Sequence, residues 1–123
     1  MSTHLLIVIY ARDMNESVPF YETLGLPRTT PGEIDEMWNE FGLGDGALAL
    51  HGLGNGELPI STGRVQVNIN VPADGTLEAV LARCKDQEYE IGTGIEDQGF
   101  GRFFWVRDPD GLPVQINERN GGH

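Results

Sequence analysis

The sequence has only one cysteine, Cys84, so no internal disulfide can form, and a reducing cytoplasm is the expected location. Basic residues are also scarce, because 8 lysines and arginines stand against 19 acidic residues, for a net charge of −11. Such a surface repels nucleic acid and anionic membranes. It favours a neutral or cationic ligand, although it also fits a surface whose charge serves only solubility.

Long apolar runs are missing as well. The run at residues 5–10 falls far short of the roughly 20 residues that a membrane helix needs. It also lacks the basic start and the cleavage site of a signal peptide. Cys84 recurs with Leu77, Val80 and Leu81 at helical spacing, which indicates a small core residue rather than a nucleophile.

What the sequence does contain is turn chemistry, with 17 glycines and one especially clear hairpin. Aromatic and β-branched residues at 103–106 predict a strand, and Asp108-Pro-Asp-Gly111 predicts a tight turn. Residues 114–117 then alternate between apolar side chains and the amides Gln115 and Asn117. An aromatic strand beside an amide-bearing strand is typical of a pocket wall.

The two halves of the chain repeat one order of elements. The first half predicts a strand at 5–11, a helix at 16–24 and strands at 36–43 and 47–51. The helix is capped by Asn15 or Asp13, and Pro19 lies near its first turn. The second half predicts a strand at 64–71, a helix at 76–84 capped near Asp74 or Thr76, a strand starting at 90–91, a loop at 96–100 and the hairpin. The glycine-rich segment 52–63 reads as the linker.

These elements predict one α+β domain over residues 1–123, built from two β-α-β-β-β modules. Module one covers about 1–52 and module two about 64–120. Each half alone is too small to bury a core, so the modules are expected to pair. Alternation in the first strand of each module separates a helix-facing set from a pocket-facing set. The pocket-facing sets are Leu6, Val8 and Tyr10 in the first module and Gln66, Asn68 and Asn70 in the second.

Two groups of residues resemble the vicinal oxygen chelate superfamily, which includes glyoxalase I, extradiol dioxygenases and bleomycin resistance proteins. The first group is Asp13, Phe20-Tyr21 and Leu24-Gly25-Leu26, and the second is Phe100-Gly-Arg102 followed by Arg107-Asp-Pro-Asp-Gly111. The resemblance covers nearly the whole chain. It implies that the two modules form open half-barrels around a concave pocket, and that the protein is a homodimer.

The metal-ligand positions depart from those of the metal-dependent members. The resemblance places them at Leu6, Gln66 and Gln115, with Ala49 or His51 on the fourth strand. A divalent metal prefers carboxylate, imidazole or thiolate donors, so we expect no metal cofactor and lean away from an enzyme. The alternative is a metal-dependent glyoxalase-, dioxygenase- or transferase-type enzyme, whose fallback ligands would be His4, His51, Gln66 and Gln115.

In character the chain resembles the bleomycin resistance proteins most, which are small acidic dimers that hold a cationic drug without a metal of their own. We therefore expect a binding protein that sequesters a planar antibiotic or aromatic metabolite by stacking, in a pocket at a dimer interface, with a role in antibiotic resistance. For each aromatic residue the alternative is core packing, which we favour for Phe20, Phe41 and Phe104. The expected ligand-binding residues are Trp38, Phe100, Phe103, Trp105, Gln66, Asn68, Gln115, Tyr10 and His51.

Overall fold

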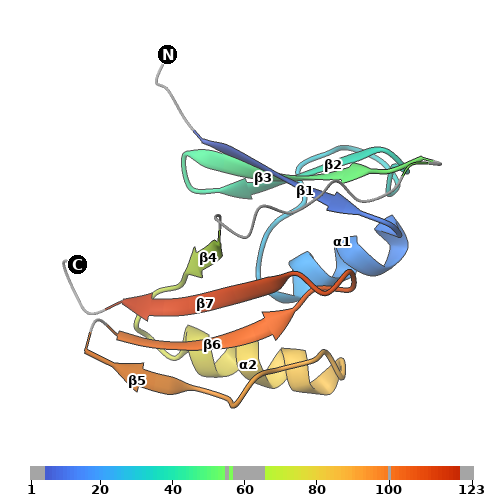
Figure 1. Ribbon diagram of the computed structural model, residues 1–123. Helices are drawn as coiled ribbons and strands as arrows, with labels where there is room; N and C mark the ends of the chain where they lie inside the picture. The colour runs from blue at the N-terminus through green and yellow to red at the C-terminus, as the bar shows by residue number, and fades with distance from the viewer. Residues whose placement is uncertain (1–4, 55, 57–65, 100, 120–123) are drawn as a thin grey trace. The chain divides into compact units, whose positions relative to one another are not determined.

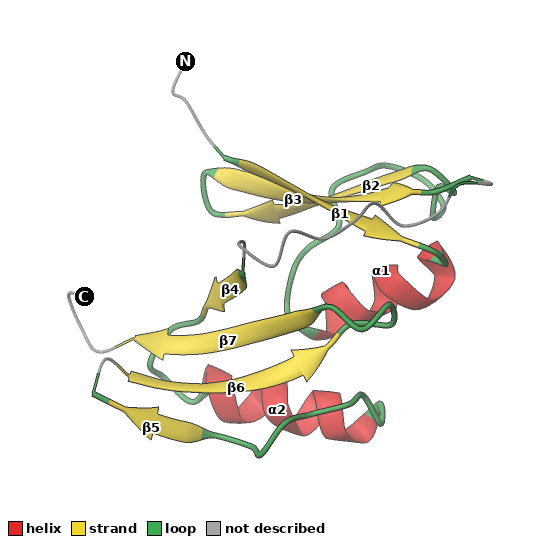
Figure 2. Ribbon diagram, in the orientation of Figure 1, coloured by secondary structure: helices red, strands yellow, loops and turns green. Residues whose placement is uncertain are grey.

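Two units make up the chain, residues 1–61 and 62–123, and each is a small sheet with one helix against it (Figure 1; Figure 2). The computed structural model describes residues 5–54, 56, 66–99 and 101–119. The predicted linker at 52–63 therefore lies largely outside the described residues, as do His4 and Phe100. No helix in the described ranges is long and apolar enough to cross a membrane.

Unit 1 is a three-stranded sheet in the order β1-β3-β2, with β1 parallel and β2 antiparallel to β3. Its helix packs against β3. Phe41 of β2 is fully buried, and its ring lies 6.1 Å from that of Tyr21 on the helix. The elements are β1 (Leu6–Ala11), α1 (Met14–Thr23), β2 (Trp38–Leu43) and β3 (Gly46–Gly52).

Helix α1 begins earlier than its sequence pattern indicates. Asp13 is the N-cap, and its carboxylate accepts a hydrogen bond from the Asn15 amide at 2.9 Å. Because the helix starts at Met14 rather than at residue 16, Pro19 lies inside the helix and not in its first turn. The prediction of Pro19 near the first turn was wrong.

Between α1 and β2, the described residues of unit 1 form a single β bridge, between Arg28 and Phe41, and no further strand, so the elements of this unit run β-α-β-β. Arg28 donates instead to three oxygens around it: Asn39 Oδ1 at 3.1 Å, the Gly32 carbonyl at 2.9 Å and the Glu33 carbonyl at 2.6 Å. These bonds hold residues 28–37 as a loop against the start of β2.

Unit 2 is a four-stranded sheet in the order β4-β7-β6-β5. The first strand, β4, pairs in parallel with the last, β7, and the other pairs are antiparallel. Residues 96–98, expected in a loop, form strand β5, because their backbone pairs with β6. The elements are β4 (Val67–Asn70), α2 (Thr76–Asp86), β5 (Glu96–Gln98), β6 (Gly101–Arg107) and β7 (Pro113–Arg119). Together the two units confirm the predicted α+β fold.

The turn predicted at residues 108–111 is present and joins β6 to β7. The Asp108 carboxylate is buried and accepts from the amides of Asp110 and Leu112, both at 2.9 Å. Gly111 has φ of +88°, a conformation in which a side chain would be strained. The residues that predicted the turn also close it, Asp108 through its side chain and Gly111 through its backbone conformation.

One face of the unit 2 sheet and the inner side of α2 form a common core. Phe104 and Val106 of β6 are fully buried on this face, and so is Cys84 of α2. Burial raises the pKa of the Cys84 thiol to about 11, which leaves almost no thiolate at neutral pH. Cys84 is a core residue.

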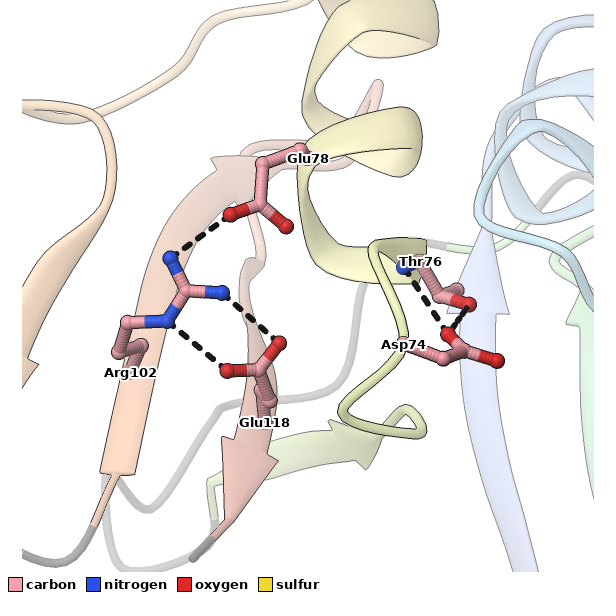
Figure 3. Close-up of polar contacts among 5 residues, drawn as sticks. All are labelled: Asp74, Thr76, Glu78, Arg102 and Glu118. Atoms are coloured by element: carbon pink, nitrogen blue, oxygen red, sulfur yellow. Dashed lines mark hydrogen bonds and ion pairs between the residues drawn. The ribbon is translucent and has the colours of Figure 1, made fainter.

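An ion-pair cluster ties α2 to β6 and β7, the two central strands of the sheet (Figure 3). Arg102 of β6 makes two hydrogen bonds to Glu118 of β7, at 2.8 and 2.9 Å, and one to Glu78 of α2 at 2.7 Å. Nearby, the Asp74 carboxylate accepts from the Thr76 amide and hydroxyl just before the helix, and these bonds lower the pKa of Asp74. Arg102, within the Phe100-Gly-Arg102 motif, therefore has a structural role.

Replacing Glu78 by glutamine is expected to make the free energy of unfolding fall less steeply as the pH is lowered. The hydrogen bond from Arg102 lowers the pKa of Glu78 below its ordinary value of 4.5. A carboxylate with a lowered folded-state pKa stabilises the fold above its unfolded pKa, and the contribution is lost as the pH falls through the folded value. Urea unfolding between pH 5 and pH 3 should show a shallower decline for Glu78→Gln than for wild type. Glu22→Gln, at an exposed position on α1, is the control, and equal slopes for all three proteins would contradict the prediction.

Candidate functional site

The sheet face of unit 1 that turns away from α1 is apolar and partly exposed. Leu6, Val8 and Tyr10 of β1 lie on it, each 40–43% exposed, whereas Ile9 and Ala11 are buried on the helix side. The strand register places Ala47, Ala49 and His51 of β3 beside them. Gly42, Glu40 and Trp38 of β2 complete the three rows.

The last of these rows brings together three rings from three strands. His51 lies between Tyr10 and Trp38, with ring centroids 5.1 Å from Tyr10 and 5.9 Å from Trp38. The Trp38 ring meets the imidazole edge-on, at an interplanar angle of 80°. Three expected ligand-binding residues thus form one continuous aromatic strip, which we call the unit 1 ring row.

Polar contacts fix the orientation of two of these rings. His51 Nδ1 lies 2.6 Å from the Gly52 carbonyl oxygen, and since a carbonyl only accepts, Nδ1 carries the proton. In the neutral ring, Nε2 is then a hydrogen-bond acceptor. The indole N–H of Trp38 donates to Glu40 at 3.1 Å, which holds a carboxylate beside the ring row.

In unit 2, the sheet face opposite α2 carries amides and two aromatic side chains. The register forms one row from Asn68, Gln115 and Trp105, across β4, β7 and β6. Gln66 Nε2 donates to Asn68 Oδ1 at 2.8 Å, so these two side chains lie on the same side. The neighbouring row is Asn70, Asn117, Phe103 and Glu96.

Trp105 lines a pocket of about 490 Å³ at this face of unit 2. Two carboxylates belong to the pocket wall. Glu90 pairs with Arg107 at 3.1 Å, and Glu96 accepts from the Thr93 hydroxyl at 3.2 Å. The lining residues are Glu90, Ile91, Gly92, Thr93, Glu96, Trp105, Arg107 and Pro113. An indole beside carboxylates suits a flat cation, through stacking and charge attraction.

Sequence reasoning did not single out residues 90–93 as part of a site. Glu90-Ile91 was expected to start a strand, and the structure has only a bridge there, between Ile91 and Val106. This bridge brings the segment against β6 and so places Glu90 and Thr93 beside Trp105. Because this bridge is a long-range contact, no local sequence pattern marks the segment as part of the site.

The side chains do not fit a bound divalent metal. Leu6 has no donor atom, and Gln66 and Gln115 offer only neutral amides, which supply no charge to offset an ion. Among the described residues, no three His, Cys, Asp or Glu side chains gather closely enough to hold one. His51 therefore belongs to no such group among the residues that the structure describes, and His4 lies outside them.

The remaining expected ligand-binding residues differ in exposure. Phe103 and Gln115 are buried on the amide face, Trp105 is half-buried, and Asn68 is exposed. Within unit 2, the structure therefore brings Gln66, Asn68, Gln115, Phe103 and Trp105 onto one face. Phe100, expected to stack on a ligand, lies outside the described residues. A ligand role for each of them stays a prediction.

Comparisons with solved structures show the same fold over nearly the whole chain. A glyoxylase/bleomycin resistance protein/dioxygenase domain from Frankia sp. EAN1pec aligns with a TM-score of 0.78 and 18% identity, covering 100% of this chain and 96% of that one. A lactoylglutathione lyase from Agrobacterium tumefaciens has a TM-score of 0.65 and 17% identity, over 96% and 94% of the chains. A bleomycin resistance determinant encoded on transposon Tn5 has a TM-score of 0.64 and 19% identity, over 97% and 99%.

At these identities the likeness shows the fold and does not choose between an enzyme and a binding protein. No match was found among curated proteins. Family membership comes from the sequence itself, since residues 3–116 match a family model. The chain belongs to the Glyoxalase/Bleomycin resistance protein/Dioxygenase superfamily.

Proposed function

We propose that this protein sequesters a flat, cationic small molecule, of the antibiotic or aromatic metabolite class, without a metal ion of its own. The observation that carries the proposal is the pocket of about 490 Å³ in unit 2, where Trp105 lies beside Glu90 and Glu96. An aromatic face contributes stacking, worth about 0.5–1.5 kcal/mol per ring pair beyond burial. The two carboxylates outnumber Arg107, the one arginine of the lining, so the pocket favours a positive charge on the ligand.

Two further features support this proposal. The unit 1 ring row offers a second aromatic surface, with the carboxylate of Glu40 held beside it by Trp38. The net charge of −11 also raises the local concentration of cations around the whole molecule. Both features would help to bind a flat cation, and neither calls for a catalytic role.

We further propose a homodimer with the ligand pocket at the interface of two copies. β1 is an edge strand of its sheet, and it exposes apolar side chains at Leu6, Val8 and Tyr10. An edge strand whose sheet face exposes apolar side chains is commonly covered by a partner. Sedimentation equilibrium of the free protein measures the mass directly, and a monomer would contradict the homodimer.

A ligand panel tests the binding function. Flat cations such as proflavine, ethidium and a bleomycin are expected to quench tryptophan fluorescence and to release heat in calorimetry. Proflavine should bind at least about 10-fold more tightly than acridone, a neutral tricycle of similar size, because only the cation gains from the net negative charge of the pocket. The preference should shrink as salt is raised, since salt screens charge attraction. Silence across the whole panel would overturn the proposed function.

A further inference from the structure

One buried side chain on the amide face of unit 2 has an unused hydrogen-bonding atom. Asn117 of β7 is only 4% exposed, and within the described part of the chain its Oδ1 has no hydrogen-bond partner. Its Nδ2 donates to Asn70 Oδ1 at 3.4 Å, near the upper limit for a hydrogen bond. Asn117 lies between Asn70 and Phe103 in the register.

Such an arrangement is unfavourable for the free protein. Nearly all buried polar atoms in native proteins are paired, because leaving one unpaired forfeits the hydrogen bonds it makes to water. An apolar side chain of similar size at this position would avoid that cost. It would sacrifice only the long bond to Asn70, whose side chain is exposed and can be hydrated instead. Folding of unit 2 therefore gives no reason for an amide at position 117.

A second amide stands in the neighbouring row of the same face. Gln115 is also buried, only 7% exposed. Residues two apart on a strand project to one side, about 7 Å from each other. The face thus has two buried amides next to aromatic Phe103 and Trp105, which is the pattern of polar groups that orient a ligand within an apolar surface.

We propose that Asn117 is a specificity-determining residue, whose Oδ1 accepts a hydrogen bond from an N–H group of the ligand. This inference rests on the proposed function and sharpens its ligand class to flat cations that carry N–H donors. A site built to pair with a donor rejects an analogue that lacks it, because the buried acceptor is then left unpaired. A flat cation of the right size but without an N–H group would leave Asn117 Oδ1 unpaired.

The test crosses one substitution with two probes. Proflavine is a flat cation with N–H groups. Its derivative methylated at both amino groups and at the ring nitrogen keeps the ring system and the charge and has no N–H. Asn117→Leu is expected to weaken proflavine binding at least about 10-fold and to change binding of the methylated cation less than about 2-fold. The methyl groups of the derivative affect its binding to wild type and to Asn117→Leu alike, so their effect cancels when the two proteins are compared.

Stability and a conservative variant supply independent measurements. Asn117→Leu should raise the melting temperature of the free protein by about 4 °C, since it removes the unpaired acceptor. Asn117→Asp keeps an oxygen at the position and should retain proflavine binding within about 3-fold. Asn117→Ala, which removes the acceptor without adding bulk, repeats the binding test should leucine fail to fold.

The outcomes separate this inference from the function on which it rests. Equal losses for both probes, or a lower melting temperature for Asn117→Leu, would show that the amide serves the structure and would overturn the inference alone. The same holds if wild type binds other flat cations of the panel but not proflavine. If wild type binds no flat cation, both the proposed function and the inference fail.

Discussion

Replacing Trp105 by alanine is expected to weaken binding of proflavine by about 30-fold or more while unit 2 stays folded. Trp105 supplies the aromatic wall of the pocket that contains Glu90 and Glu96. Truncating a central aromatic anchor commonly costs about 2 kcal/mol or more, which corresponds to about a 30-fold change in the dissociation constant. Calorimetry should measure the loss, because the substitution also removes the tryptophan of the pocket and leaves only Trp38 as a fluorescent reporter.

Trp105→Phe is the matched control for this substitution. It keeps a stacking face but reduces its area, so binding should fall by no more than about 5-fold. Because Trp105 is only half-buried, neither variant should lower the melting temperature by more than a few degrees. Wild-type affinity in Trp105→Ala would show that the ligand binds elsewhere, and the unit 1 ring row would then be the next candidate site.

Replacing Phe104 by alanine should have the opposite outcome, a large loss of stability. Phe104 is fully buried on the face that packs against α2, directly across from Ile116 in the strand register. Truncation of a buried phenylalanine typically costs about 3–5 kcal/mol, a large share of the roughly 5–15 kcal/mol that stabilises a small domain. Urea unfolding followed by circular dichroism measures the change.

Trp105→Ala serves as the control for Phe104→Ala, because the two residues are neighbours on opposite faces of β6. Phe104→Leu, which keeps most of the apolar volume, should cost clearly less, about 1–2 kcal/mol. A loss below about 1 kcal/mol in Phe104→Ala would contradict the packing of α2 on this face. One residue is thus expected to affect binding and the next to affect folding.

Much of the fold follows from local chemistry. Alternating side chains separate the two faces of β1 and β4, and Asp108-Pro-Asp-Gly111 specifies its turn with its own side-chain and backbone bonds. β5 could not be predicted in this way, because Glu96, Asp97 and Gln98 have low strand propensity. Their strand geometry depends on pairing with β6, which is a tertiary effect.

The candidate site was predictable as a set of faces but not as a set of contacts. Alternation places Tyr10 on the pocket-facing side of its own strand, yet the ring row exists only because β3 lies between β1 and β2 and so brings His51 and Trp38 beside it. The carboxylate of Glu90 joins Trp105 through a single bridge at Ile91, which has no repeating pattern in the sequence. Long-range pairing of this kind leaves no local signal.

The parallel pairing of β4 with β7 has a consequence for the order of folding. Asn70 and Asn117, partners in this ladder, stand 47 residues apart in the sequence. The β6–β7 hairpin closes locally, whereas closing the longer loop between β4 and β7 costs more entropy, so we expect β4 to pair after that hairpin has formed or as it forms. The amide face is therefore assembled late, and it exists only when unit 2 is complete. A ligand held there binds the native state alone, so its occupancy protects the whole unit against unfolding in proportion to its concentration and affinity.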